Sequence, residues 1–171
     1  MQNLENKADK YVVYRLEICR VGDIVKKCFD GINEKEYYTL FPVATKCTYY
    51  IPVDNLEGNI RPVMTKGQFI ELLDKLPNIR NERISNKGDR KHIFSVAIKT
   101  GDYNCIIPLI NEIYNEKNNS NKKRKQLYNE DRKYLELLSK FLQCEVAFSF
   151  GIGIDEAEDL IRNKVSGYDY I

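Results

Sequence analysis

Tryptophan is absent from the 171-residue sequence, and histidine occurs only once, as His92. His92 stands among basic residues and has no thiol or hydroxyl partner at a recognisable spacing, which is typical of a solvated or structural histidine rather than a catalytic one. The glycine-rich segment GIGIDE at 151–156 lacks the Lys-Ser/Thr end of a nucleotide-binding loop. We therefore expect a protein that is not an enzyme and needs no cofactor.

Long apolar runs and paired cysteines are also missing. No stretch approaches the roughly 18 to 20 consecutive apolar residues that a membrane-spanning helix needs. The polar start, MQNLENKADK, has no apolar segment of the kind that a secretion signal carries. The five cysteines are scattered without a CxxC pair, so neither a metal site nor a disulfide framework is expected. These absences predict a cytoplasmic protein that does not contact a membrane and whose cysteines are small buried side chains.

Neither sign of charge is in large excess. The chain has 27 Lys and Arg against 25 Asp and Glu, a net charge of +2, which excludes a basic field over the whole molecule. The distribution is uneven, however, because residues 80–99 contain six basic residues and only two acidic ones. A second basic run, Lys122 to Lys125, has the composition of a solvated loop. Residues 80–99 are therefore the stronger candidate for an anion-binding surface.

The first third of the sequence has the pattern of short strands. Runs rich in Val, Ile, Tyr, Phe and Thr are separated by Asp, Gly, Asn and Pro, and we expect strands at 11–14, 17–25, 36–41 and 47–53. Asp30-Gly31 marks a hairpin turn between the second and third of them. Strands this short, with brief connections, predict an antiparallel meander curled into a small barrel or half-barrel.

After residue 64 the apolar residues recur at helical spacing. Thr65 and Gln68 have the form of a capping box at the start of the first helix, which Pro77 ends. Further helices are expected at 92–98, after Asp102, after Asn129 and from Asp155 onward, and Pro108 is a possible kink in the helix after Asp102. The sequence thus predicts an α+β protein of two modules: a polar tail at 1–7, an antiparallel β domain at 8–63 and an all-helical domain at 64–171.

Four segments occur in an order that is informative as a set, although no single one is distinctive. They are YVVYRLEICRVGDI at 11–24, EYYTLFPVATKCTYYIPVDN at 36–55, IRPVMTKGQFIELLDKLP at 60–77, and IKTGDYNCIIPLINEI followed by LYNEDRKYLELLSKFLQCEVAFSFGI at 98–113 and 127–152. Together they resemble the CarD/CdnL family of bacterial RNA polymerase-binding transcription regulators, whose β domain also occurs in transcription-repair coupling factors.

The resemblance implies a Tudor-like (SH3-like) β domain that docks on the RNA polymerase β subunit by strand addition. Strand addition is physically reasonable because an open sheet edge presents unpaired N–H and C=O groups. The family's polymerase contacts correspond here to Lys27, Cys28, Tyr49 and Tyr50. The alternative for the two tyrosines is that they are ordinary strand residues, one facing the core and one facing the surface.

The resemblance also implies that the helical domain contacts promoter DNA at the upstream edge of the melted region. Sequence-independent phosphate contacts would come from basic residues in the stretch 80–99, namely Arg83, Lys87, Arg90, Lys91 and Lys99. The alternative for each of them is a solvated surface position. Family members generally place a DNA-wedging Trp in this stretch, and counting back from Thr100-Gly101-Asp102 puts Lys87 at that place.

Two functions from different classes follow. The first is a transcription regulator that binds the polymerase β subunit and, weakly, promoter DNA. The second is a protein-interaction module that keeps a polymerase or self-association surface, including a strand-exchanged homodimer, but has lost DNA-wedging activity. The missing Trp favours the second function, and the basic residues at 80–99 favour the first.

Overall fold

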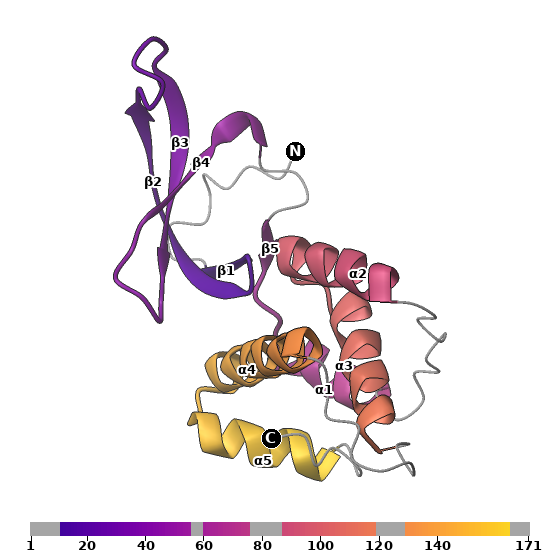
Figure 1. The fold of residues 1–171 in the computed structure, drawn as a ribbon. Helices are drawn as coiled ribbons and strands as arrows, with labels where there is room; N and C mark the ends of the chain where they lie inside the picture. The colour runs from indigo at the N-terminus through magenta and orange to yellow at the C-terminus, as the bar shows by residue number, and fades with distance from the viewer. Residues whose placement is uncertain (1–10, 56–59, 76–86, 119–128, 165–171) are drawn as a thin grey trace. The chain divides into compact units, whose positions relative to one another are not determined.

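The computed structural model describes residues 11–55, 60–75, 87–118 and 129–164 (Figure 1). The chain divides into two compact units, Met1–Val63 and Met64–Ile171. All described strands belong to the first unit and all described α-helices to the second. The α+β organisation of a sheet followed by helices, predicted from the sequence, is therefore observed.

The described residues of the first unit form a five-stranded antiparallel sheet with strand order β4-β3-β2-β1-β5. The strands are β1 (Tyr11–Tyr14), β2 (Glu17–Lys27), β3 (Lys35–Pro42), β4 (Tyr49–Pro52) and β5 (Ile60–Pro62), and a short 3-10 helix, η2 (Val53–Asn55), follows β4. Four strands lie where the sequence predicts them. Strand β5 was not predicted, because three residues ending in proline carry too little alternation to be recognised. Among the described strands β4 and β5 do not pair with each other, so closure into a barrel is not observed.

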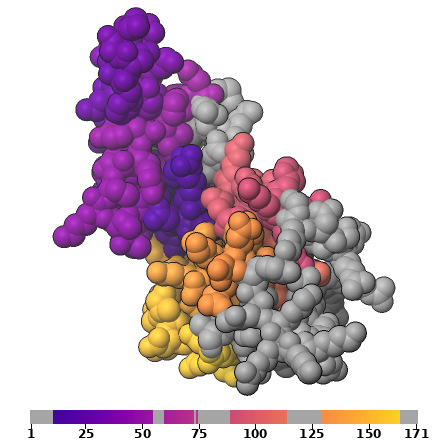
Figure 2. All heavy atoms as spheres, viewed as in Figure 1, coloured from indigo at the N-terminus to yellow at the C-terminus, as the bar shows by residue number. Residues whose placement is uncertain are grey.

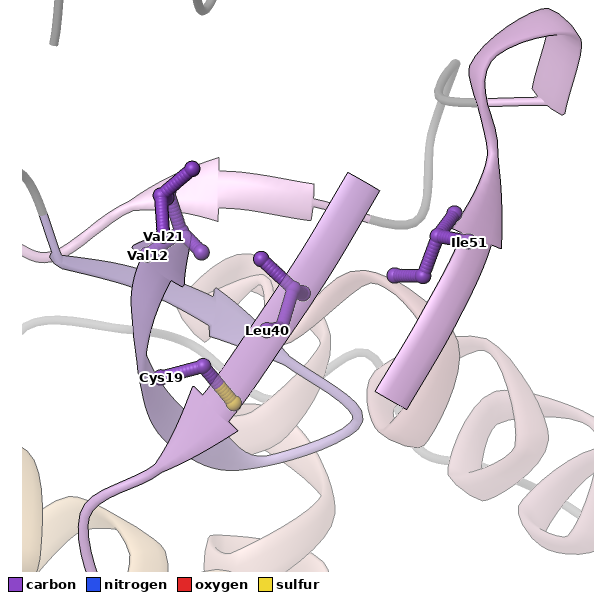
Figure 3. Packing of buried hydrophobic residues seen from close by; sticks show 5 residues of the cluster. All are labelled: Val12, Cys19, Val21, Leu40 and Ile51. Atoms are coloured by element: carbon purple, nitrogen blue, oxygen red, sulfur yellow. The ribbon is translucent and has the colours of Figure 1, made fainter. Parts of the chain in front are cut away.

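Side chains from four strands meet on one face of this sheet and form its core. Successive residues of a strand point to opposite faces, and the buried ones converge as Figure 3 shows. They are Val12, Cys19, Val21, Leu40 and Ile51. Tyr14, Tyr49 and Ile60 pack against this cluster. The core thus fixes which face of β2, β3 and β4 points away from it.

The turn between β1 and β2 consists of only two residues. Arg15 and Leu16 both have positive φ, 50° and 63°, which is the backbone of the type I′ turn that matches the twist of paired strands. Asn-Gly is the usual sequence for such a turn because side chains disfavour positive φ. Leu16 is 8% exposed, so burial of its side chain offsets part of that cost.

The register of β2 against β3 shifts between Val21 and Ile24, which marks a β-bulge. Gly22 lies in it, and a Cβ atom at this position would stand 2.4 Å from Phe41 Cε2 and 2.5 Å from Thr39 Oγ1. The Thr39 hydroxyl is already committed, because it donates to the Asp23 carbonyl at 2.7 Å. The close approach of Phe41 and Thr39 therefore requires glycine.

Replacing Gly22 by alanine should destabilise the protein by about 1–3 kcal/mol, the usual cost of overpacking. The methyl group would displace the Phe41 ring or break the hydrogen bond from Thr39 to Asp23. Gly67→Ala is the matched control, because nothing lies within 4 Å of its Cβ position and alanine is the better helix former. Urea unfolding checks both, and equal stability of the two variants would contradict the packing at the bulge.

The described part of the second unit contains five α-helices. They are α1 (Lys66–Lys75), α2 (Lys87–Thr100), α3 (Tyr103–Asn118), α4 (Asn129–Phe150) and α5 (Ile154–Lys164). Thr65 and Gln68 form the predicted capping box, with Thr65 N–H donating to Gln68 Oε1 at 2.8 Å and Gln68 N–H to Thr65 Oγ1 at 3.3 Å. The Asp102 carboxylate caps α3 by accepting the Asn104 N–H at 2.9 Å. Pro108 lies inside α3 without ending it.

The interior of this unit is apolar apart from a few buried charged groups. Phe69, Ile106, Ile110, Leu138 and Val146 are at most 1% exposed, and the Tyr103 ring packs between Phe69 and Phe141 with centroid distances of 5.6 and 5.8 Å.

Within the described residues no single helix is long and apolar enough to cross a membrane. Helices α4 and α5, which are bent by 104° at their junction, meet the test of length and composition only as a pair.

The expectation that the cysteines are buried is only partly correct. All five are free, and Cys19 is fully buried, which raises the pKa of its thiol to about 12. Cys105 and Cys144 are half-buried, and burial raises the pKa of both thiols. Cys28 and Cys47 are exposed, since they lie in the connections that precede and follow β3.

Candidate functional site

Strand β4 ends the sheet on one side. It pairs with β3 through Leu40↔Tyr49, Thr39↔Tyr50, Tyr38↔Ile51 and Tyr37↔Pro52, and no described strand pairs with its other side. Ile51 is 4% exposed and faces the core, whereas Tyr50 is 40% exposed on the opposite face. A sheet edge that no described strand occupies, beside an exposed aromatic ring, has the features of a strand-binding surface.

The end of the β2–β3 hairpin adds further rings to this surface. Phe29 is 62% exposed, and its ring makes edge contacts with Tyr37 and Tyr50 at centroid distances of 5.0 and 5.4 Å. The Lys27 ammonium lies 5.9 Å from the centroid of the Tyr50 ring. We call Phe29, Tyr37 and Tyr50 the hairpin aromatic cluster. Two residues predicted for the polymerase surface, Lys27 and Tyr50, thus come together here.

Figure 2 draws the atoms of the sheet unit, the β2–β3 hairpin among them, in indigo to purple. Asp30 determines the shape of this hairpin, because its Oδ1 accepts the N–H groups of Ile32 at 3.0 Å and Asn33 at 2.8 Å. These hydrogen bonds hold the pKa of Asp30 well below its usual range. Cys28, the third predicted residue, is exposed with its Sγ 3.6 Å from Asp30 Oδ1.

Tyr49 differs from its neighbours. Its side chain is on the core face of β4, its ring lies 5.3 Å from that of Tyr14, and its hydroxyl donates a hydrogen bond to Glu17 Oε2. This hydrogen bond, together with burial and the Glu17 charge, raises the pKa of Tyr49. The structure therefore separates Tyr49 from Tyr50, in agreement with the alternative that one tyrosine faces the core and the other the surface.

The hydrogen bond from Tyr49 to Glu17 predicts a stability that depends on pH. Because the folded state holds the Tyr49 proton more tightly than the unfolded chain does, its contribution is complete below a pH of about 10, the unfolded value, and falls as the pH rises further. Urea unfolding at neutral and alkaline pH should show a larger alkaline loss for the wild type than for Tyr49→Phe. Equal losses in the two proteins would contradict the hydrogen bond.

The basic residues predicted to bind DNA fall into three groups. Arg83 lies outside the described residues. Lys87 is the first residue of α2, but its side chain is not among those that the structure describes. Lys91 and Lys99 are exposed on α2. They are eight residues apart, which corresponds to about 12 Å along the helix axis, so they are spaced to contact separate phosphates.

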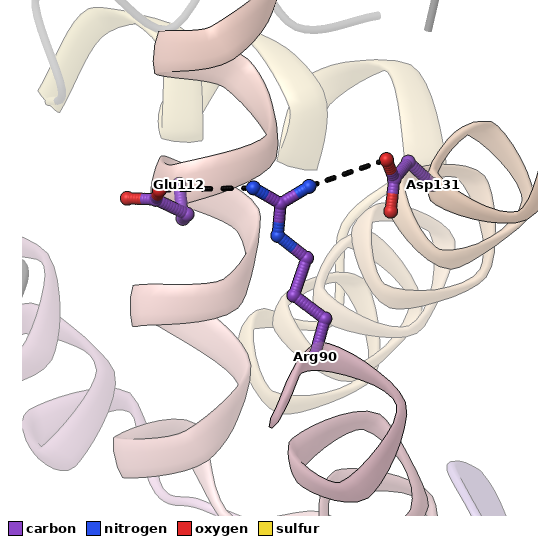
Figure 4. Close-up of polar contacts among 3 residues, drawn as sticks. All are labelled: Arg90, Glu112 and Asp131. Atoms are coloured by element: carbon purple, nitrogen blue, oxygen red, sulfur yellow. Dashed lines mark hydrogen bonds and ion pairs between the residues drawn. The ribbon is translucent and has the colours of Figure 1, made fainter. Parts of the chain in front are cut away.

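The prediction for Arg90 is wrong. Its side chain is only 5% exposed, with Nη1 3.3 Å from Asp131 Oδ2 and Nη2 3.7 Å from Glu112 Oε1. Figure 4 shows the guanidinium between these two carboxylates, which come from α4 and α3. Arg90 faces the interior of the helical unit, whereas Lys91, the next residue, faces solvent. Arg90 therefore joins three helices and is not available to a phosphate.

Sequence reasoning missed two parts of the surface, Phe29 and Tyr37. The usable signal was a phenylalanine next to the turn residues Asp30-Gly31, where polar residues are usual. Tyr37 lies on the same face of β3 as Thr39, which pairs with Tyr50. Period-two alternation from Tyr50 through Thr39 would have placed Tyr37 beside it.

The described residues contain no candidate metal site, and the comparisons with known proteins assign no family to the chain. Among the described residues, no group of three or more His, Cys, Asp or Glu side chains is placed to hold a metal ion. A scan against protein-family models found no match, and a search of the curated proteins found none either. The resemblance to the CarD/CdnL family therefore stays a prediction from the sequence.

Proposed function

We propose that this protein is a transcription regulator whose Tudor-like β unit binds the β subunit of bacterial RNA polymerase. The observation that carries the proposal is the edge of β4, which pairs with no strand in the described part of the chain and lies next to the exposed Tyr50 ring and the rest of the hairpin aromatic cluster. This surface contains Lys27, Cys28 and Tyr50, three of the four positions to which the family resemblance assigns polymerase contacts.

The chemistry of the surface suits a protein strand. Main-chain groups of β4 supply hydrogen bonds to an added strand, and neighbouring side chains supply specificity. Aromatic residues are enriched at the centre of protein interfaces and often account for most of the binding energy. Tyr50 and Phe29 offer large apolar area with few rotatable bonds, so little entropy is lost when a partner covers them.

Titration of a polymerase β-subunit lobe fragment tests the proposal. We expect a dissociation constant in the micromolar range or tighter for the wild type, and Tyr50→Ala should weaken binding about tenfold or more, as loss of a central aromatic does. Ile32→Ala is the matched control, because Ile32 is 84% exposed in the same hairpin and lies outside the aromatic cluster. Absence of binding, or equal affinities of the two variants, would contradict the proposal.

The helical unit is the proposed DNA-binding part. Lys91 and Lys99, with Arg83 and Lys87 as further candidates, would contact phosphates and give weak affinity that is independent of sequence and sensitive to salt. Binding of a forked promoter fragment at low salt, reduced in a Lys91→Ala, Lys99→Ala double variant, is the expected result.

A second candidate function is an interaction module that has lost DNA binding. The burial of Arg90 between Glu112 and Asp131 favours it, as does the absence of a wedging Trp. Such a module would bind the polymerase lobe, or a second copy of the chain through β4, but not the forked fragment at low salt. Sedimentation of the protein alone identifies self-association.

A further inference from the structure

The face of the sheet that points away from the core carries a second arrangement of side chains. Paired residues of antiparallel strands share a face. The pairs Arg20↔Phe41 and Lys27↔Lys35 therefore each lie on one face, and it is the face that carries Tyr50. Cys19 and Leu40 of the core lie on the opposite face. Tyr37 follows by alternation along β3. We define Arg20, Lys27, Tyr37, Phe41, Tyr50 and Phe29, whose ring lies against Tyr37 and Tyr50, as the outer face.

The aromatic rings of the outer face are accessible. Phe29 and Tyr50 are exposed, and Tyr37 and Phe41 are half-buried, so each ring keeps part of its surface open to solvent. The bulge at Gly22 makes room for the Phe41 ring to lie against the sheet. Rings spread over neighbouring strands in this way form a platform on which planar groups can stack.

Cations accompany the rings. The guanidinium carbon of Arg20 lies 4.9 Å above the centroid of Phe41, and Lys27 lies over Tyr50, with Lys35 directly opposite Lys27 in the register. Of the nearby acids, Glu36 pairs with Lys26 on the other face of the strands, and Glu17 accepts the Tyr49 hydroxyl on the core side. The Asp30 carboxylate, next to Phe29 in sequence, accepts the Ile32 and Asn33 N–H groups of its own turn. Asp23 stands at the bulge. The ligand that complements this face is planar and negatively charged.

We propose that the outer face binds single-stranded DNA. Exposed bases would stack on the rings while Arg20, Lys27 and Lys35 pair with phosphates, a combination that binds single strands with little regard to sequence. Duplex DNA is not bound in this way because its bases are already stacked inside the helix. RNA is distinguished by polar groups that recognise its 2′-hydroxyl. The hydroxyls on this face belong to Thr39, which donates to the Asp23 carbonyl, and to Tyr37 and Tyr50, so oligo(U) is compared with oligo(dT) in the test. The outer face shares Lys27, Phe29, Tyr37 and Tyr50 with the proposed polymerase-binding surface. The inference does not require polymerase binding, because its test is made without polymerase.

Fluorescence anisotropy of a labelled oligo(dT) strand, measured at low salt and without polymerase, tests this inference. The full chain carries Lys91→Ala and Lys99→Ala in all these measurements, so that these two exposed lysines of α2 contribute no phosphate contacts. Two neighbouring pairs of residues supply matched controls. Lys27→Ala should weaken binding more than Lys26→Ala, because the two lysines are on opposite faces of β2. Phe29→Ala should weaken it by about five- to a hundredfold, the usual effect of losing one stacked base, whereas Ile32→Ala should change it little.

The salt dependence gives an independent check. With three phosphate contacts, the logarithm of the association constant should fall with the logarithm of salt concentration with a slope of about −2. Equal affinity for duplex and single strand, tighter binding of oligo(U) than of oligo(dT), or no binding at low salt would each overturn the proposal. Absence of oligonucleotide binding together with dimerisation that Phe29→Ala abolishes would assign the face to a second copy of the chain instead.

Discussion

Replacing Arg90 by methionine is expected to lower the free energy of unfolding by about 3–5 kcal/mol, the usual cost of removing one partner from a buried ion pair. The guanidinium is enclosed by α2, α3 and α4 and lies between Glu112 and Asp131, which are 8% and 5% exposed. Methionine fills most of the side-chain volume but leaves both carboxylates without the cation. Urea unfolding followed by circular dichroism measures the loss.

The neighbour Lys91 provides the control for this substitution. Lys91→Met changes the same charge to the same side chain on the same helix but at an exposed position, so a change within about 0.5 kcal/mol is expected. Adding Glu112→Leu and Asp131→Leu to Arg90→Met should recover much of the loss, since a well-packed apolar substitute for a buried ion triad is often neutral or stabilising. If Arg90→Met and Lys91→Met have the same free energy of unfolding, the ion triad of Arg90, Glu112 and Asp131 does not stabilise the fold.

Glu145→Ala is expected to destabilise the protein by about 3 kcal/mol, because it leaves two donors without their acceptor and opens a cavity. Glu145 is fully buried in α4. Its Oε1 accepts the Met64 N–H at 2.9 Å and its Oε2 accepts the Tyr103 hydroxyl at 2.8 Å. The carboxylate thus joins the segment before α1 to α3 and α4.

Two variants separate the hydrogen bonds of Glu145 from its volume. Glu145→Gln keeps one acceptor oxygen and nearly the same shape, so it should lose roughly half as much stability as Glu145→Ala. Glu136→Ala, at an exposed position of the same helix, should change stability by about 0.5 kcal/mol or less. If Glu145→Ala and Glu136→Ala unfold at the same urea concentration, the buried carboxylate does not have the role described here.

Most of the fold follows from patterns that the sequence displays locally. The strands at 11–14 and 36–41 form where Val, Tyr, Thr and Phe are concentrated, and the capping box at Thr65 and the cap at Asp102 form as spacing predicts. Helix α2 was expected to begin at His92 but begins at Lys87. Its first turns contain Gly88 and Asp89 with no apolar face, and the residue that packs inward there is the charged Arg90, so hydrophobic periodicity could not reveal them.

The candidate sites were harder to predict than the fold because partners distant in sequence decide them. The local sequence predicts a surface cation at Arg90. Its burial depends on ion pairs with Glu112 and Asp131, which are 22 and 41 residues further along the chain. Tyr49 and Tyr50 are adjacent in sequence, and only the direction of the core determines which of them is available to a partner. Phe29 joins the surface through contacts with two other strands, which a local pattern cannot contain.

We propose that a strand of RNA polymerase pairs with the edge of β4. Amide hydrogen exchange with and without the polymerase β-subunit lobe fragment tests it most directly, because a newly paired strand protects backbone N–H groups. If strand addition occurs, exchange becomes slower in β4 and in the hairpin around Phe29, while β5, at the opposite edge of the sheet, is unchanged. A complex that forms without protecting β4, or that protects β5 or the helical unit instead, would contradict it.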